Sequence, residues 1–186
     1  MDEEKHDEYR AIVGGLLYLS VNTRFDIAFQ VGKLARFMSA PTTKHLAAAY
    51  HVLRYLKGTS ELAVHYIMLG VDRSIHAYSD VDFAGDKTTM KSTTGVLIKM
   101  GESPIIWTSR LQSLVTTSTA EAELAAAAAA AKEILWMQEL LIEIGERRDK
   151  TLPCDNEATV QSVRNTTAVY RCAMNSVRVR PECPKG

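Results

Sequence analysis

AYSDVDFAGD, residues 77–86, is the stretch that decides how this chain folds. Apolar and β-favouring residues lead into it, so we expect a strand over residues 75–83. Because side chains alternate along a strand, Asp80 and Asp82 should point to the same face. Two neighbouring carboxylates repel each other unless a cation or a hydrogen-bond network holds them. Gly85 favours a turn, so the strand should end beside this acidic group.

The acidic group has two interpretations from these residues alone. Solvated acids at the end of a surface strand are the simpler one. The other is a hard-metal site, since Mg²⁺ prefers carboxylate and water oxygens. A calcium loop of the EF-hand type is excluded, because Ala84 and Lys91 stand where it needs an oxygen ligand and a glutamate. A phosphatase with Asp80 as nucleophile and Asp82 as acid/base would leave the acids further along the chain unexplained.

Composition narrows the class of protein. The chain has 186 residues, enough for one domain and a smaller unit, and 46% of them are hydrophobic, so a core can form. The formal net charge is zero, so any surface for nucleic acid must be local. The three cysteines leave an odd count and form no CxxC pair, which favours a reducing, intracellular compartment. No apolar run reaches the length of a membrane span.

The spacing of apolar residues divides the chain into three parts. Residues 1–58 have helical periodicity and are expected to form a small unit of three helices without catalytic residues. Residues 59–164 change to short strands and longer helices, while residues 165–186 lack periodicity and are expected to be an irregular tail. The three expected helices of the first part run from Tyr9 to Leu19, from a Thr23-x-x-Asp26 capping box to Phe37, and from Thr43 to Lys57.

The middle part is expected to contain an antiparallel meander that carries the acidic group. A helix rich in alanine follows it, from Ser118 to Gly145, and then a strand and a further helix. The expected strands are Leu62–Leu69, Ile75–Phe83, Gly95–Met100, Pro104–Ser109 and Leu152–Asp155, and the last helix is Asn156–Arg164.

Acidic residues recur at the ends or beginnings of these elements. Asp80 ends a strand, Glu121 and Glu123 lie in the first turn of the long helix, and Asp155 ends the next strand. Strand ends and helix starts are where α/β folds gather ligands. Ser118-x-x-Glu121 is a capping box, so we assign Glu121 to the helix cap and Glu123 to the site. Asp155 taken alone would fit a helix N-cap.

Five motifs follow one another in an order that resembles one known family, the ribonuclease H domain of copia-type retrotransposon polyproteins. They are YSDVDFAGD, KSTTG, IIWTSRLQ, STAEAELAAAAAAAKEILWMQELL and CDNEATV. Two upstream segments, YRAIVGGLLYLSVNTRFDIAFQVGKLARFM and HVLRYLKGT, resemble the end of the reverse transcriptase and its connection to that domain. The resemblance is specific, because the motifs occur in order with similar gaps.

The resemblance implies a ribonuclease H-like fold of the α/β class, with an α+β mixed sheet flanked by helices and preceded by a small three-helix segment. Its activity would be metal-dependent hydrolysis of the RNA strand of an RNA·DNA hybrid. The implied partners are the hybrid and the reverse transcriptase portion of the same polyprotein, with no membrane and no small-molecule cofactor. The implied location is a cytoplasmic retrotransposon particle or the nucleus.

Carried over position by position, Asp80, Glu123 and Asp155 match catalytic carboxylates of the family. In that family these carboxylates hold two Mg²⁺ ions, for which Mn²⁺ can substitute. One metal ion generates hydroxide while the other stabilises the leaving 3′ oxygen. Asp82 and Asp86 recur in the motif without matching a core ligand, so they hold water, tune the site or only make the turn.

Lys91, Ser92 and Thr93 lie in the KSTTG motif, where a phosphate backbone could pass. Lysine and hydroxyl donors suit contacts with phosphate oxygens. A solvated strand start is an equal alternative for these three residues. Selectivity for a hybrid would come from 2′-hydroxyl contacts and groove shape rather than from base edges.

The sequence departs from the family pattern near its end. Family members have a last strand and a helix with a fourth catalytic aspartate, and no aspartate follows Asp155 here. We therefore expect a C-terminally truncated fold without the final strand and helix. One metal ion would be poorly held, so cleavage should be weak or absent. The alternative function is a non-catalytic nucleic-acid-binding or interaction fragment of a retrotransposon polyprotein.

Overall fold

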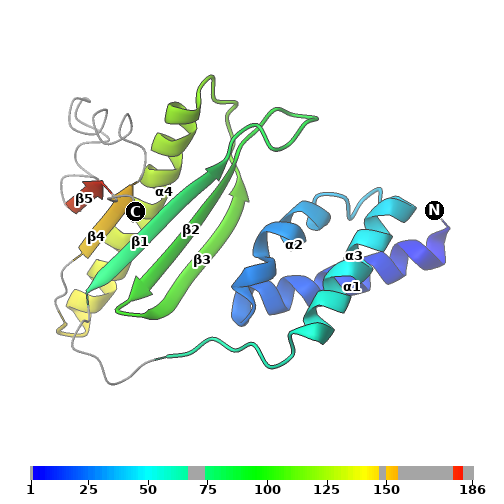
Figure 1. The fold of residues 1–186 in the computed structure, drawn as a ribbon, viewed down its shortest axis with the longest axis horizontal. Helices are drawn as coiled ribbons and strands as arrows, with labels where there is room; N and C mark the ends of the chain where they lie inside the picture. Colours follow the sequence, from blue (N-terminus) through cyan, green and yellow to red (C-terminus); the bar gives the residue numbers. More distant parts are fainter. Residues whose placement is uncertain (1, 67–73, 147–149, 155–177, 182–186) are drawn as a thin grey trace, which may run out of the picture. The chain divides into compact units, whose positions relative to one another are not determined.

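The structure, a computed structural model, describes residues 2–66, 74–146, 150–154 and 178–181 (Figure 1). The chain forms two compact units, Met1–Val64 and His65–Gly186. The spacing of apolar residues places this boundary slightly earlier, after residue 58. Each unit has its own core and is described by itself.

The first unit consists of helices packed around one apolar cluster. Tyr9 lies in this cluster, fully buried, and its hydroxyl donates a hydrogen bond of 2.7 Å to the carbonyl oxygen of Leu34. The first helix begins before Tyr9, because the Asp2 carboxylate caps it by accepting from the Lys5 amide. The elements are α1 (Glu3–Asn22), the 3₁₀ turn η1 (Phe25–Ile27), α2 (Ala28–Ala35) and α3 (Thr43–Gly58).

The capping box expected at Thr23-x-x-Asp26 is wrong. The Asp26 carboxylate instead accepts hydrogen bonds from Arg24, at 2.7 and 3.0 Å, and from the Tyr55 hydroxyl at 2.9 Å. Arg24 also donates to the carbonyl oxygen of Thr59 at 3.1 Å. The Arg24 guanidinium holds the pKa of Asp26 below its usual range. This network joins the chain before η1 to the end of α3.

The second unit is a mixed sheet with one long helix on a face. Its strands are β1 (Ile75–Asp82), β2 (Thr93–Met100), β3 (Ser103–Leu111), β4 (Lys150–Cys154) and β5 (Arg178–Pro181), and its helix is α4 (Thr119–Glu143). The sheet order is β3-β2-β1-β4-β5 (Figure 1). The first three strands are antiparallel, whereas β4 runs parallel to β1 and β5 runs parallel to β4. The predicted α+β mixed sheet is therefore confirmed.

Two predictions at the margins of this sheet are wrong. Of the strand expected over Leu62–Leu69, residues 62–66 are described and form no strand; Leu62 and Tyr66 are exposed. Residues 165–186 are not irregular throughout as predicted, because Arg178–Pro181 forms β5, which pairs with β4. Its Arg-Val-Arg sequence alternates with the period of a strand, and an edge position tolerates Pro181. The helix expected over 156–164 lies outside the described residues.

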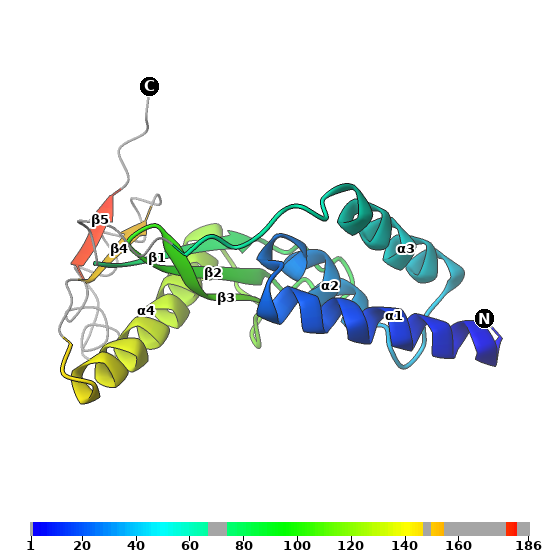
Figure 2. The ribbon, with the colours of Figure 1, turned by 90° about the horizontal axis from the view of Figure 1, so that it is seen from below.

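Helix α4 covers one face of the sheet (Figure 2). Ile75 and Ala77 of β1 and Ile98 of β2 are fully buried beneath it. The alanines do more than favour a helix, because their small side chains let α4 approach the strands closely. The residues of α4 buried in this core are Ala127, Ala130, Ala131, Ile134, Met137 and Leu141. Within the described residues, no helix is long and apolar enough to cross a membrane.

Replacement of Ile134 by alanine tests this packing. Ile134 is fully buried, whereas Ile142 on the same helix is 45% exposed. We expect Ile134→Ala to lower the free energy of unfolding of the second unit by about 2–5 kcal/mol. Ile142→Ala, the matched control, should change it by about 0.5 kcal/mol or less. Tryptophan fluorescence in a urea titration reports this unit alone, because both tryptophans lie in it. Equal losses in the two variants would show that α4 does not pack as described.

Candidate functional site

The aspartates of β1 lie on one face of the sheet. The pairing of β1 with β2 is regular along the whole of β1, so side chains alternate without interruption. Ile75 and Ala77 point to α4, and Asp80 and Asp82 therefore lie on the other face, where both are exposed. The sequence prediction that Asp80 and Asp82 share a face is confirmed.

Asp82 and Asp86 both shape the turn that follows β1. The Asp82 carboxylate folds over Gly85, so that a Cβ added at Gly85 would lie 1.9 Å from Asp82 Oδ2. A side chain at Gly85 would therefore displace this carboxylate. The Asp86 carboxylate accepts hydrogen bonds from the amides of Thr88, at 3.0 Å, and Thr89, at 3.3 Å. Of the roles left open by the sequence, these hydrogen bonds show the one in the turn for Asp86.

The segment Lys91–Thr93 is mostly internal. Ser92 is fully buried, and its hydroxyl accepts a hydrogen bond of 3.1 Å from the Ala84 amide. Thr93 is 3% exposed, and Lys91 is half-buried. Contact of this segment with a phosphate stays a prediction, and Lys91 is the member whose side chain best reaches solvent.

Glu121 caps α4. Its carboxylate accepts hydrogen bonds from the Thr117 amide at 2.7 Å and from the Thr117 hydroxyl at 3.0 Å. The Ser118 hydroxyl accepts in return from the Glu121 amide at 3.2 Å. The hydrogen bond that the Thr117 backbone amide donates is the main reason that the pKa of Glu121 lies below its ordinary value. The assignment of Glu121 to the helix cap is confirmed.

Glu123 occupies a different face of the same helix turn. It is half-buried and lies four and seven residues before Ala127 and Ala130, so it shares the stripe of α4 that faces the sheet. Asp155 lies outside the described residues. In the part of the chain that is described, no group of three or more acidic, histidine or cysteine side chains could hold a metal ion. The metal site of Asp80, Glu123 and Asp155 therefore stays a prediction.

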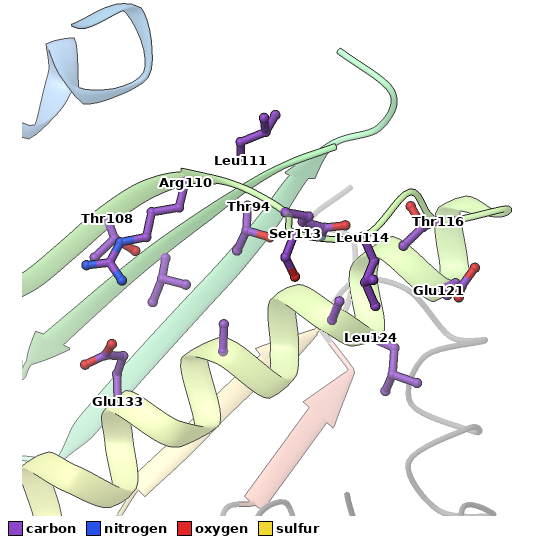
Figure 3. Close-up of a pocket in the computed structure, with 14 residues that line it drawn as sticks. Thr94, Thr108, Arg110, Leu111, Ser113, Leu114, Thr116, Glu121, Leu124 and Glu133 are labelled. Carbon is purple, nitrogen blue, oxygen red and sulfur yellow. Dashed lines mark hydrogen bonds between the residues drawn. The ribbon is translucent and has the colours of Figure 1, made fainter. Parts of the chain in front are cut away.

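A groove runs between α4 and the strands β2 and β3 (Figure 3). Its volume is about 450 Å³. Gln112, in its wall, donates hydrogen bonds to Thr94 Oγ1 at 2.9 Å and to the carbonyl oxygen of Ala122 at 3.0 Å. Gln112 is not among the residues predicted from the sequence, although a polar residue that directly follows a strand and precedes the helix can indicate such a bridge. The side chains labelled in Figure 3 are Thr94, Thr108, Arg110, Leu111, Ser113, Leu114, Thr116, Glu121, Leu124 and Glu133.

A methyl group at Gly85 should displace the Asp82 carboxylate. Gly85→Ala puts the new carbon where this carboxylate now lies, and the side chain of Asp82 must rotate away. Gly95→Ala is the matched control, because its Cβ would meet only the Asp80 carbonyl oxygen at an ordinary 3.9 Å. Carbon-13 NMR should show a shifted Asp82 carboxyl resonance in Gly85→Ala and an unchanged one in Gly95→Ala. An unshifted resonance in Gly85→Ala would contradict the described turn.

The cap made by Glu121 should give a pH-dependent contribution to stability. Because the pKa of Glu121 in the folded chain is below the ordinary value of a glutamate, the stabilisation is present above that ordinary value and is lost as the pH falls through the folded pKa. Glu121→Gln should therefore lower the melting temperature at pH 7 and leave it nearly unchanged at pH 2. Glu139→Gln, an exposed change further along α4, should cause no loss at pH 7. A Glu121→Gln deficit of equal size at both pH values would rule out the charged cap.

Comparison with known proteins places the chain among transposon sequences. It is 44% identical over 168 residues to the retrovirus-related Pol polyprotein from transposon RE1 of Arabidopsis thaliana, covering 89% of this chain and 11% of that protein. It is 36% identical over 173 residues to the corresponding polyprotein from transposon TNT 1-94 of Nicotiana tabacum, covering 92% of this chain and 13% of that protein. It is also 37% identical to secreted RxLR effector protein 161 of Plasmopara viticola, covering 72% of this chain and 93% of that protein.

Neither a family model nor a solved structure matches the chain. The chain spans about a tenth of the length of the polyproteins that it matches. The predicted resemblance to retrotransposon polyproteins is confirmed by these sequence identities. With identities of 36–44% over about nine-tenths of its length, the chain is a homologue of one segment of the retrovirus-related Pol polyproteins of transposons.

Proposed function

We propose that the second unit is a ribonuclease H domain that hydrolyses the RNA strand of RNA·DNA hybrids with divalent metal ions. The observation that carries the proposal is the parallel pairing of β4 with β1, which sets Ile75 opposite Lys150 and His76 opposite Thr151. Asp155, the next residue in the sequence after β4, is assigned to the same site by its match to the family motif. Asp155 lies outside the described residues, so its part in the site belongs to the proposal.

Carboxylates that share one site need a counter-charge. In a shared site Asp80 and Asp155 would repel each other, and a bound cation removes the repulsion. Glu123 adds a third carboxylate from the first turn of α4, a helix that contacts both β1 and β4. Because Asp80 lies on the face of the sheet away from α4, Glu123 has to reach the ions around the end of β1 rather than through the core. A set made only of carboxylate oxygens suits Mg²⁺ or Mn²⁺ rather than a softer metal ion.

Hydrolysis of a phosphodiester follows from metal ions held by carboxylate oxygens. When bound, the metal ions would supply an activated water and stabilise the leaving 3′ oxygen. The part of Asp80, Glu123 and Asp155 is to hold the ions, and exposure of Asp80 leaves room for ligands from water and from the nucleic acid. Because the sequence offers three matched carboxylates, we expect slow cleavage.

The first unit has a separate assignment. We assign Met1–Val64, through its resemblance to the end of a reverse transcriptase, to contact with the reverse transcriptase portion of the same polyprotein. The place of action that goes with both assignments is a cytoplasmic retrotransposon particle or the nucleus.

Cleavage of a labelled RNA·DNA hybrid tests the nuclease proposal. We expect Mg²⁺-dependent cutting of the RNA strand by the full chain, and its loss in Asp80→Asn and Glu123→Gln, because each change removes a charged ligand. Asp86→Asn is the matched control and should keep the wild-type rate, since an asparagine oxygen can still accept from the Thr88 and Thr89 amides.

Hybrid affinity, measured in parallel by fluorescence anisotropy, should be retained in Asp80→Asn. Cleavage that is as fast in Asp80→Asn as in the wild type would show that the site is elsewhere or that the activity is a contaminant. Tight hybrid binding by the wild type without cleavage in either Mg²⁺ or Mn²⁺ would replace the nuclease by a nucleic-acid-binding module.

A further inference from the structure

We propose that Ser92 and Gln112 are positioning residues that hold the end of β1, with Asp80, in a fixed relation to the first turn of α4, with Glu123. The proposal rests on the nuclease function, because it assigns these two side chains to the geometry of that metal site. Neither touches substrate or metal in this account. Each acts through the backbone segments that carry the carboxylates.

The Ser92 hydroxyl joins the loop after β1 to the segment before α4. It accepts a hydrogen bond of 3.1 Å from the Ala84 amide and lies 3.3 Å from Thr116 Oγ1, which is itself in a buried residue. Ser92 has no exposed surface. With the Ala84 amide as donor to its oxygen, the hydroxyl can donate its own proton to Thr116. One buried group thus connects two segments that are 32 residues apart in sequence (116 minus 84).

The backbone at Ala84 shows why such a tie is needed. Ala84 has a φ of 48°, in the left-handed region that favours glycine. A residue with a side chain keeps this conformation only when its surroundings hold it there. The bond from its amide to Ser92 supplies part of that restraint. Loss of the Ser92 hydroxyl should therefore let the Asp82–Gly85 turn, and the strand end before it, move.

Gln112 completes the connection to α4. Its amide donates to the carbonyl oxygen of Ser92 at 2.8 Å, and its side-chain nitrogen reaches the carbonyl oxygen of Ala122 at 3.0 Å. Ala122 directly precedes Glu123. The side chain also donates to Thr94 Oγ1 at 2.9 Å, so its direction is fixed by one hydrogen bond to β2 and one to α4.

The side-chain carbonyl oxygen of Gln112 is in an unfavourable environment. Its Oε1 atom is buried and has no hydrogen-bond partner in the described part of the chain. A buried carbonyl oxygen without a donor is unfavourable. The two donated bonds, rather than burial, are what this side chain contributes.

Mn²⁺ affinity of the full chain, measured by electron paramagnetic resonance, tests the proposal. We expect Ser92→Ala and Gln112→Met to weaken Mn²⁺ binding about 10-fold or more, as changes behind metal ligands commonly do. Ser92→Thr, which keeps the hydroxyl, should restore most of the affinity. Thr89→Ala is the matched control, because it removes an exposed hydroxyl from the same loop. Titrations far below each variant's melting temperature keep loss of fold out of the comparison.

Two further readouts separate positioning from general stability. In the cleavage assay, Ser92→Ala and Gln112→Met should lower kcat with little change in hybrid affinity. Hydrogen exchange at the Ala84 amide should accelerate in Ser92→Ala and stay unchanged in Thr89→Ala. If Ser92→Ala does not fold, Gln112→Met decides the outcome.

The failure of this proposal can be told from failure of the nuclease function. Mn²⁺ binding that Asp80→Asn abolishes, and that neither Ser92→Ala nor Gln112→Met weakens, overturns positioning and leaves the function intact. Wild-type Mn²⁺ affinity in Asp80→Asn overturns both. Equal losses of affinity in Ser92→Ala and Thr89→Ala also overturn positioning, because an exposed hydroxyl would then matter as much as the buried one.

Discussion

Contact between the alanine stripe of α4 and the strands β1 and β2 is the constraint on which the second unit depends. Ala127 and Ala130 are almost fully buried against the sheet, and their short side chains let the helix axis come close. Ile134 fixes the rotation of the helix from further along the same stripe. The direction of Glu123, one turn before Ala127, follows from that rotation. The hydrophobic core thereby determines where the helix carboxylate points.

The acidic residues divide into structural and candidate catalytic ones. Asp86 and Glu121 accept hydrogen bonds from backbone amides, and Asp82 is folded over the turn glycine. The charge of Asp86 therefore serves the turn and that of Glu121 the helix cap. Asp80 is exposed on a regular strand, and Glu123 faces the sheet. The number of acidic residues in the sequence alone does not distinguish these two groups.

Local patterns explain which predictions succeeded. The alternation along residues 75–82 and the cap at Ser118 are short-range signals, and the structure follows them. The bridge from Ser92 to Gln112 depends on hydrogen bonds between distant segments, which leave no periodicity. The strand at residues 178–181 is short and exists through its pairing with β4, so propensity alone did not reveal it.

The central claim is that Asp80, Glu123 and Asp155 converge on divalent metal. Paramagnetic broadening of amide resonances by substoichiometric Mn²⁺ tests it most directly, because the effect falls steeply with distance from the bound ion. The account predicts that the resonances of residues 80, 123 and 155 broaden together, at Mn²⁺ levels that leave the acidic first turn of α1 (Glu3 and Glu4) unaffected. Broadening at Asp80 without Glu123 and Asp155, or equal broadening at Glu3 and Glu4, would contradict a shared site.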